Sequence, residues 1–120
     1  MEKMIFVVDD TESMLTLVSS VLDDDFRVLT MLSAEKMFSL LERKRPDLIV
    51  LDVEMPDING FEAAGRLRES AEWQDIPVVF LTGFIDDTVL TKATHLKVLY
   101  VIDKTEITSS LLSIVNELLD

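Results

Sequence analysis

The chain has 120 residues, of which 48% are hydrophobic, and its formal net charge is −12. This length fits one domain with a single core, the apolar content excludes a disordered chain, and the negative charge disfavours direct binding to nucleic acid or to anionic lipid. The chain has no cysteine, no apolar stretch near the roughly 20 residues of a membrane helix and no signal-peptide pattern, so we expect a cytoplasmic protein that does not enter the membrane.

Five short apolar runs, rich in valine and isoleucine, predict β-strands. They span Ile5–Val8, Phe26–Thr30, Leu48–Leu51, Val78–Leu81 and Val98–Ile102. Four of them are nearly continuous, which is typical of strands buried on both faces of a parallel sheet. The second run is interrupted by Arg27 and reads as an edge strand.

Stretches of helical period separate these strands. Their apolar faces comprise Met14, Leu17, Val18 and Val21; Met37, Leu40 and Leu41; Phe61, Ala64 and Leu67; and Leu111, Leu112, Val115, Leu118 and Leu119. The stretch Thr88–Leu96 is the least amphipathic, and Ser33 and Thr105 are expected N-caps.

Strands that alternate with helices predict an α/β fold. The expected architecture is a (βα)5, flavodoxin-like, doubly wound five-stranded parallel sheet with strand order 2-1-3-4-5, in a single domain over residues 1–120. Because the chain stops at Asp120, directly after the last expected helix, we expect it to carry no output domain of its own.

Polar side chains follow four of the expected strands. Asp9 and Asp10 follow the first, Asp52 the third, Thr82 the fourth and Lys104 the fifth. In open α/β sheets, ligands bind beyond the carboxyl ends of the strands, near the switch in strand order. Since these four strands are expected to be neighbours, the five side chains should converge on one small rim.

Three neighbouring carboxylates repel one another. Two unit charges about 4 Å apart interact by about 4 kcal/mol at an effective dielectric near 20, so such a cluster either raises its pKa values or binds a cation. Oxygen ligands without histidine or cysteine suit Mg²⁺, or Mn²⁺. We therefore expect a divalent cation that screens an incoming phosphoryl group, with Asp52 as the nucleophile and Thr82 and Lys104 as ligands of the phosphoryl oxygens.

This ordered set resembles the receiver domain of two-component response regulators, the superfamily of the chemotaxis regulators. The resemblance covers essentially the whole chain. Besides the acidic pair and the strand-end residues, it includes the stretch "DVEMPDING", in which Pro56 and Gly60 stand at the family's offsets from Asp52. Each element alone is weak, but the ordered set is highly specific.

The resemblance implies roles for these residues. Asp52 would take a phosphoryl group from a histidine kinase or a histidine phosphotransfer protein. Asp10, Asp52 and the backbone carbonyl of Glu54 would bind Mg²⁺ directly, with Asp9 assisting. The protein would catalyse only its own phosphorylation and dephosphorylation, which does not make it an enzyme in the ordinary sense, and it would act on an output domain or a partner protein.

Two departures from the family pattern lie close to Lys104. Thr105 follows it where proline is usual, and because a cis bond before a non-proline residue costs about 3–4 kcal/mol, we expect a trans bond or a reshaped loop. The place of the switch aromatic, three residues before the lysine, holds Val101, whereas Tyr100 should face the other side of the strand.

Further departures lie nearby. Lys97 and Val98 replace the familiar Gly-Ala before the fifth strand, and Gly83 stands where a small alanine is frequent. Glu54 and Phe84 occupy positions that shape the access of hydrolytic water in the family, so they are expected to modulate phosphoryl lifetime. The face formed by the fourth helix, the fifth strand and the fifth helix is the family's usual output surface and a candidate homodimer interface.

Three other functions stay open. A degenerate receiver could serve as a phosphorylation-independent interaction module. A haloacid-dehalogenase-like phosphatase also uses Asp and Mg²⁺, but its carboxylate spacing would have to be taken from Asp52-Val53-Glu54. A flavodoxin-like mononucleotide binder needs a Ser/Thr/Gly-rich loop after the first strand, where "DDTES" is acidic instead.

Overall fold

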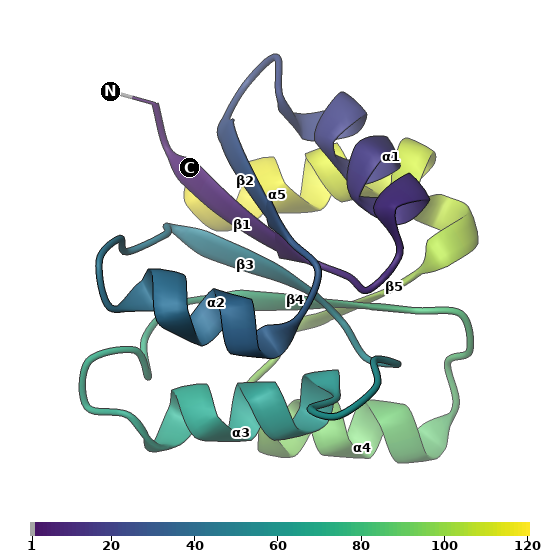
Figure 1. Ribbon diagram of the computed structural model, residues 1–120. Helices are drawn as coiled ribbons and strands as arrows, with labels where there is room; N and C mark the ends of the chain where they lie inside the picture. The colour runs from purple at the N-terminus through teal and green to yellow at the C-terminus, as the bar shows by residue number, and fades with distance from the viewer. Residues whose placement is uncertain (1) are drawn as a thin grey trace.

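A computed structural model describes residues 2–120, which form five strands alternating with five α-helices (Figure 1). The strands are β1 (Met4–Val8), β2 (Arg27–Met31), β3 (Leu48–Asp52), β4 (Val78–Thr82) and β5 (Tyr100–Asp103). The helices are α1 (Glu12–Leu22), α2 (Ala34–Leu41), α3 (Gly60–Glu69), α4 (Asp87–His95) and α5 (Leu112–Leu119), with a 3₁₀ turn, η1 (Lys104–Glu106), and a π-helical turn, η2 (Ile107–Leu111), between β5 and α5. No helix in residues 2–120 combines the length and the apolar character that crossing a membrane requires.

The strands formed by residues 2–120 make one parallel sheet of order β2-β1-β3-β4-β5. This confirms the predicted doubly wound fold, and each strand begins and ends within two residues of its predicted bounds. The register pairs Asp52 with Leu81 and Thr82 with Asp103. The ends of β3, β4 and β5 are therefore level with one another.

The sheet separates two apolar cores, and Figure 1 shows α1 and α5 on one face and α2, α3 and α4 on the other. Strand residues alternate between them: Phe6, Val8, Ile49, Leu51 and Phe80 face α2, α3 and α4, whereas Ile5, Val7, Val50, Val79 and Leu81 face α1 and α5. Burying one such side chain stabilises the fold by about 1.5–3 kcal/mol. This two-sided burial explains why β1, β3 and β4 are continuous apolar runs, while β2 lies at the edge and is partly exposed.

The two predicted N-caps have different outcomes. The Ser33 hydroxyl accepts a hydrogen bond from the amide of Lys36, which confirms it as the cap of α2. The prediction for Thr105 is wrong: its amide and its hydroxyl both donate to Asp103 Oδ1, at 2.9 and 2.7 Å. The aspartate is the stronger acceptor, so it caps η1 and uses Thr105 as the donor.

Candidate functional site

The aspartates predicted to converge do so at the carboxyl ends of β1 and β3. Asp9 and Asp10 follow β1 and Asp52 ends β3, and one carboxylate oxygen of each lies within 4.8 Å of the other two. The side chains of Asp9 and Asp52 are buried, whereas Asp10 is exposed to solvent. The cluster is therefore open to solvent at Asp10 and enclosed by protein at Asp9 and Asp52.

Lys104 enters this cluster from the end of β5. Its Nζ lies 3.1 Å from Asp52 Oδ1 and 3.5 Å from Asp9 Oδ2. No peptide bond among residues 2–120 is cis, so the bond before Thr105 is trans, as expected. The hydrogen bonds of Asp103 to Thr105 hold the chain that carries the lysine. The unusual residue after Lys104 therefore leaves its side chain directed into the site.

The cluster perturbs the ionisation of its members. Burial raises the pKa of Asp52 to about 7; the hydrogen bond from Lys104 opposes this rise, and the charge of Asp9 adds to it. Burial by itself would lower the pKa of Lys104, but its hydrogen bond to Asp52 and the charges of Asp52, Asp9 and Glu54 together raise it. The buried carboxyl group of Asp52 therefore lies beside a Lys104 side chain that stays positively charged.

The carboxylates leave oxygen atoms without partners. Asp9 Oδ2 and Asp52 Oδ2 are buried and have no hydrogen-bond partner in the described chain. The opposite oxygens are satisfied, because the amide of Thr11 donates to Asp9 Oδ1 at 2.9 Å and that of Glu54 donates to Asp52 Oδ1 at 3.2 Å. The Asp52 oxygen has no partner, the Asp9 oxygen has only the Lys104 ammonium at 3.5 Å, and the third carboxylate is exposed; together these oxygens fit a hard divalent cation such as Mg²⁺ or Mn²⁺.

Thr82 lies beside this cluster, at the end of β4, and is buried. Its Oγ1 lies 2.9 Å from both carboxylate oxygens of Glu54, and the amide of Gly83 donates to Glu54 Oε1 at 3.1 Å. The amide of Phe84 donates to the Thr82 oxygen at 3.2 Å. A modulating role was expected for Glu54, but not this contact of its side chain with Thr82 and Gly83. The register of Asp52 with Leu81 places the loops after β3 and β4 side by side, but the bond itself depends on the rotamer of Glu54, for which the sequence carries no signal.

Of the residues considered for the switch, Glu54 and Gly83 lie at the site beside Thr82, whereas the side chains of Tyr100, Val101 and Phe84 do not. Tyr100 is partly buried and packs against the core between the sheet and the helices α1 and α5, whereas Val101 packs on the opposite face of the sheet, as their alternation predicts. Phe84 is 68% exposed and points its ring into solvent. Thr82 therefore has no aromatic side chain from β5 at the family's usual position three residues before the lysine.

Gly60 fixes the loop between β3 and α3. Its amide donates to the carbonyl of Val53 at 2.9 Å, and a Cβ atom at this position would lie 2.4 Å from the carbonyl oxygen of Asp52. Only glycine allows this approach, because heavy-atom contacts below 3.0 Å force the backbone apart. Gly60 thus lets the start of α3 pack against the backbone of Asp52 and Val53.

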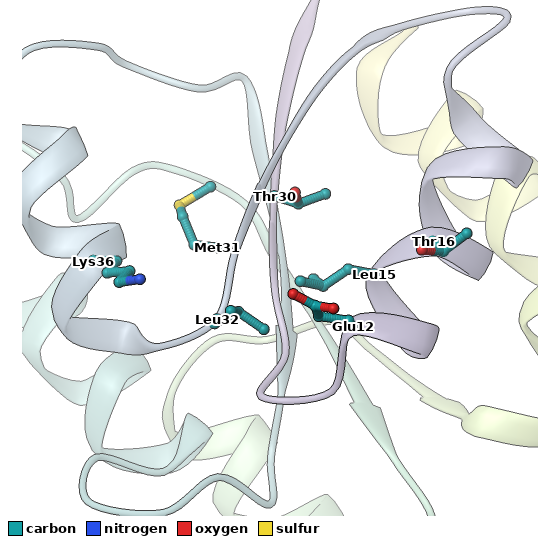
Figure 2. Close-up of a pocket in the computed structure, with 7 residues that line it drawn as sticks. All are labelled: Glu12, Leu15, Thr16, Thr30, Met31, Leu32 and Lys36. Atoms are coloured by element: carbon teal, nitrogen blue, oxygen red, sulfur yellow. The ribbon is translucent and has the colours of Figure 1, made fainter.

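A separate depression of about 340 Å³ crosses the edge strand β2 between α1 and α2 (Figure 2). Glu12 and Leu15 line it from α1, Thr30 and Met31 from β2, and Lys36 from α2. It contains none of the clustered aspartates, so the acidic cluster remains the place where reactive groups concentrate.

Comparisons with known proteins agree with this geometry. The family model of the response regulator receiver domain matches residues 5–116. Protein RcaC of Microchaete diplosiphon is 36% identical over 91 residues, which cover 76% of this chain and 14% of that protein. Transcriptional regulatory protein AfsQ1 of Streptomyces coelicolor is 38% identical over 87 residues, 72% of this chain and 37% of that protein. The chain thus spans well under half the length of these two relatives.

Solved structures show the same fold. Chemotaxis protein CheY4 of Vibrio cholerae superposes with a TM-score of 0.92 at 23% identity, over 99% of this chain and all of that one. The BeF3-activated receiver domain of DrrB superposes with a TM-score of 0.88 at 29% identity, over 99% of this chain and 98% of the other. Because the receiver-domain model matches residues 5–116, the chain belongs to the receiver-domain family of two-component response regulators.

Proposed function

We propose that Asp52 is a phosphoacceptor that takes its phosphoryl group from a phosphohistidine on a histidine kinase or a histidine phosphotransfer protein. The observation that carries this proposal is the environment of Asp52. Its carboxylate is buried, contacts Lys104 at 3.1 Å and shares a cluster with two further aspartates. A buried nucleophile with a fixed cation beside it is suited to group transfer through an anionic transition state.

In the transfer step, an oxygen of the Asp52 carboxylate forms a bond to phosphorus while the phosphorus–nitrogen bond of the donor breaks. The electron pair of that bond remains on the imidazole nitrogen. Lys104 and the hydroxyl of Thr82 stabilise charge on the phosphoryl oxygens. Water would later hydrolyse the aspartyl phosphate, which releases inorganic phosphate and returns Asp52 to its free carboxylate.

Asp9, Asp10, Asp52 and the backbone carbonyl of Glu54 would hold a divalent cation, Mg²⁺ or Mn²⁺. The cation would supply positive charge between the carboxylates and the phosphoryl oxygens. The buried oxygens of Asp9 and Asp52 that accept no hydrogen bond support this assignment. Related proteins support the chemistry: the DrrB receiver was solved as a BeF3-activated form, and the response regulator RcpA, 27% identical, was solved phosphorylated.

Phosphorylation would switch the surface of α4, β5 and α5, through which the protein would act on an output domain or a partner in the cytoplasm, or form a homodimer. This surface exposes Leu90 and Leu99, at 45% and 78%. The matched part covers only 14% of RcaC and 37% of the transcriptional regulatory protein AfsQ1, in keeping with a receiver joined to another module.

A test uses beryllofluoride, a phosphoryl analogue, with Mg²⁺ and amide NMR spectra. Residues around Asp52 and Thr82 should shift on addition, and Asp52→Asn should abolish the response. Absence of any shift at millimolar Mg²⁺ and beryllofluoride would instead support a phosphorylation-independent interaction module. Release of many equivalents of phosphate from small phosphomonoesters would instead support a phosphatase.

A further inference from the structure

The side chain of Glu54 is bound where an oxyanion would be bound. Two donors face its carboxylate: the hydroxyl of Thr82, 2.9 Å from both oxygens, and the amide of Gly83, 3.1 Å from Oε1. One comes from the last residue of β4 and the other from the residue after it. A side-chain hydroxyl and a backbone amide that converge on one anionic group form an oxyanion site.

The carboxylate of Glu54 also acts electrostatically on the ammonium group of Lys104. The negative charge of Glu54 is among the influences that raise the pKa of Lys104, after those of Asp52 and Asp9. The carboxylate of Glu54 therefore contacts two donors of the pocket, the Thr82 hydroxyl and the Gly83 amide, and its charge also acts on the Lys104 ammonium. These are the groups that an incoming phosphoryl oxygen needs as partners.

We propose that the Glu54 carboxylate is a built-in competitor of the phosphoryl group, which occupies the Thr82–Gly83 oxyanion site before phosphorylation and leaves it when a phosphoryl oxygen arrives. The inference rests on the proposed function, since it takes Asp52 as the phosphoacceptor. Glu54 is exposed and lies in a loop, so its side chain is free to turn into solvent without disturbing the core.

The competition has two consequences. The affinity of the pocket for a phosphoryl group or its analogue is lowered, because the hydrogen bonds to Glu54 are broken first. The Thr82 hydroxyl is also held toward the β3–α3 loop before phosphorylation, and this contact is lost when the phosphoryl group arrives.

Three variants separate competition from a simple effect of charge. Glu54→Ala removes the carboxylate, and Glu54→Asp keeps the charge but is one methylene too short to reach both donors. Glu72→Ala removes an exposed glutamate in the turn before β4 and serves as the matched control. All three keep the backbone carbonyl of residue 54.

The dissociation constant of beryllofluoride is measured at saturating Mg²⁺ by amide NMR or tryptophan fluorescence. Competition predicts that Glu54→Ala and Glu54→Asp each bind about tenfold more tightly than wild type, while Glu72→Ala stays within twofold. In the metal-free protein without beryllofluoride, the Gly83 amide resonance should move upfield in both Glu54 variants and stay in place in Glu72→Ala, because a hydrogen bond to a carboxylate is lost.

Each contrary result has a distinct meaning. Binding within twofold of wild type in both Glu54 variants overturns the competition and leaves the proposed function intact. Tighter binding in Glu54→Ala alone, with Glu54→Asp like wild type, reduces the effect to charge and also overturns it. Absence of binding in wild type and in all variants refutes the proposed function and the competition together.

Discussion

Replacing Asp52 by asparagine should stabilise the metal-free protein at alkaline pH. Asp52 is fully buried, and its burial and the charge of Asp9 raise its pKa to about 7 even though Lys104 contacts it. Keeping this carboxylate ionised therefore costs folding free energy. Asparagine has nearly the same shape and carries no charge, so the substitution should recover that cost.

The magnitude follows from the shift in pKa. Asp52 rises from 3.8 to about 7, and one pKa unit corresponds to about 1.4 kcal/mol. The cost of the charge at pH 8 is thus at most about 4 kcal/mol, and we expect Asp52→Asn to raise the free energy of unfolding by about 2–4 kcal/mol. Such a gain is large beside the 5–15 kcal/mol that stabilise most domains.

The sign of the pH dependence is fixed by the same shift. Between about pH 4 and pH 7, folded wild type binds more protons at Asp52 than the unfolded chain does, so its contribution to stability is present at low pH and is lost as the pH rises through 7. The gap between variant and wild type should therefore be near zero at pH 4 and full at pH 8. Urea unfolding with EDTA at several pH values measures it.

Two additions make this test decisive. Asp24→Asn, an exposed aspartate in the turn after α1, is the matched control and should change stability by less than about 0.5 kcal/mol. Mg²⁺ at a hundredfold excess over its dissociation constant should add about 2.7 kcal/mol to wild type and less to Asp52→Asn. A variant less stable than wild type at pH 8 without metal, or a gap that does not depend on pH, refutes the reasoning.

Three further predictions concern the stability of the fold, each measured by urea unfolding. Gly60→Ala should lower the free energy of unfolding by about 3 kcal/mol or more, because its Cβ would lie 2.4 Å from the carbonyl oxygen of Asp52. Gly65→Ala should raise it by about 0.5–1 kcal/mol, because its Cβ would meet only a side-chain methyl at 3.8 Å. Equal effects of the two substitutions would contradict this contrast. Lys97→Gly should raise the free energy of unfolding by about 1 kcal/mol, since Lys97 has a φ of 59° after α4 and glycine adopts this conformation without strain. A lower free energy of unfolding would show that the side chain of Lys97 matters more than its backbone conformation. Arg68→Ala should cost about 2–4 kcal/mol, because the guanidinium donates to three backbone carbonyls at 2.8–3.0 Å, and a cost below 0.5 kcal/mol would show that water replaces it.

The strand order and the meeting of the acidic residues could be predicted because both follow from regular patterns. Continuous apolar runs mark strands buried on two faces, and parallel strands bring their carboxyl ends to one edge. Once those strands are neighbours, the strand ends fix the positions of Asp9, Asp52 and Lys104. The observed contacts of 3.1 and 3.5 Å between the lysine and the two aspartates agree with this expectation.

The details that escaped prediction depend on side-chain choices among nearby alternatives. Thr105 was expected to cap a helix, but it donates to Asp103, because a carboxylate two residues earlier competes for the same groups. The bond between Glu54 and Thr82 depends on which rotamer an exposed glutamate adopts, and no periodicity in the sequence encodes it. Residues whose positions are set by the ladder are predictable, and those set by a rotamer are not.

This distinction explains why the loss of the usual proline after the lysine leaves the site in place. Thr82 pairs with Asp103 in the β4–β5 ladder, so residue 104 leaves the sheet level with the end of β4 whatever residue follows it. Asp103 then fixes the turn through the amide and the hydroxyl of Thr105. The position of Lys104 is thus a property of strand register, which a one-residue slip would destroy by turning every side chain of β5 to the opposite face. In the proposed function, transmission of the signal would differ from the usual aromatic switch, because Val101 has no aromatic ring to rotate. Coupling of Thr82 to the β5 surface would then use the contact of Glu54 with Thr82 and Gly83.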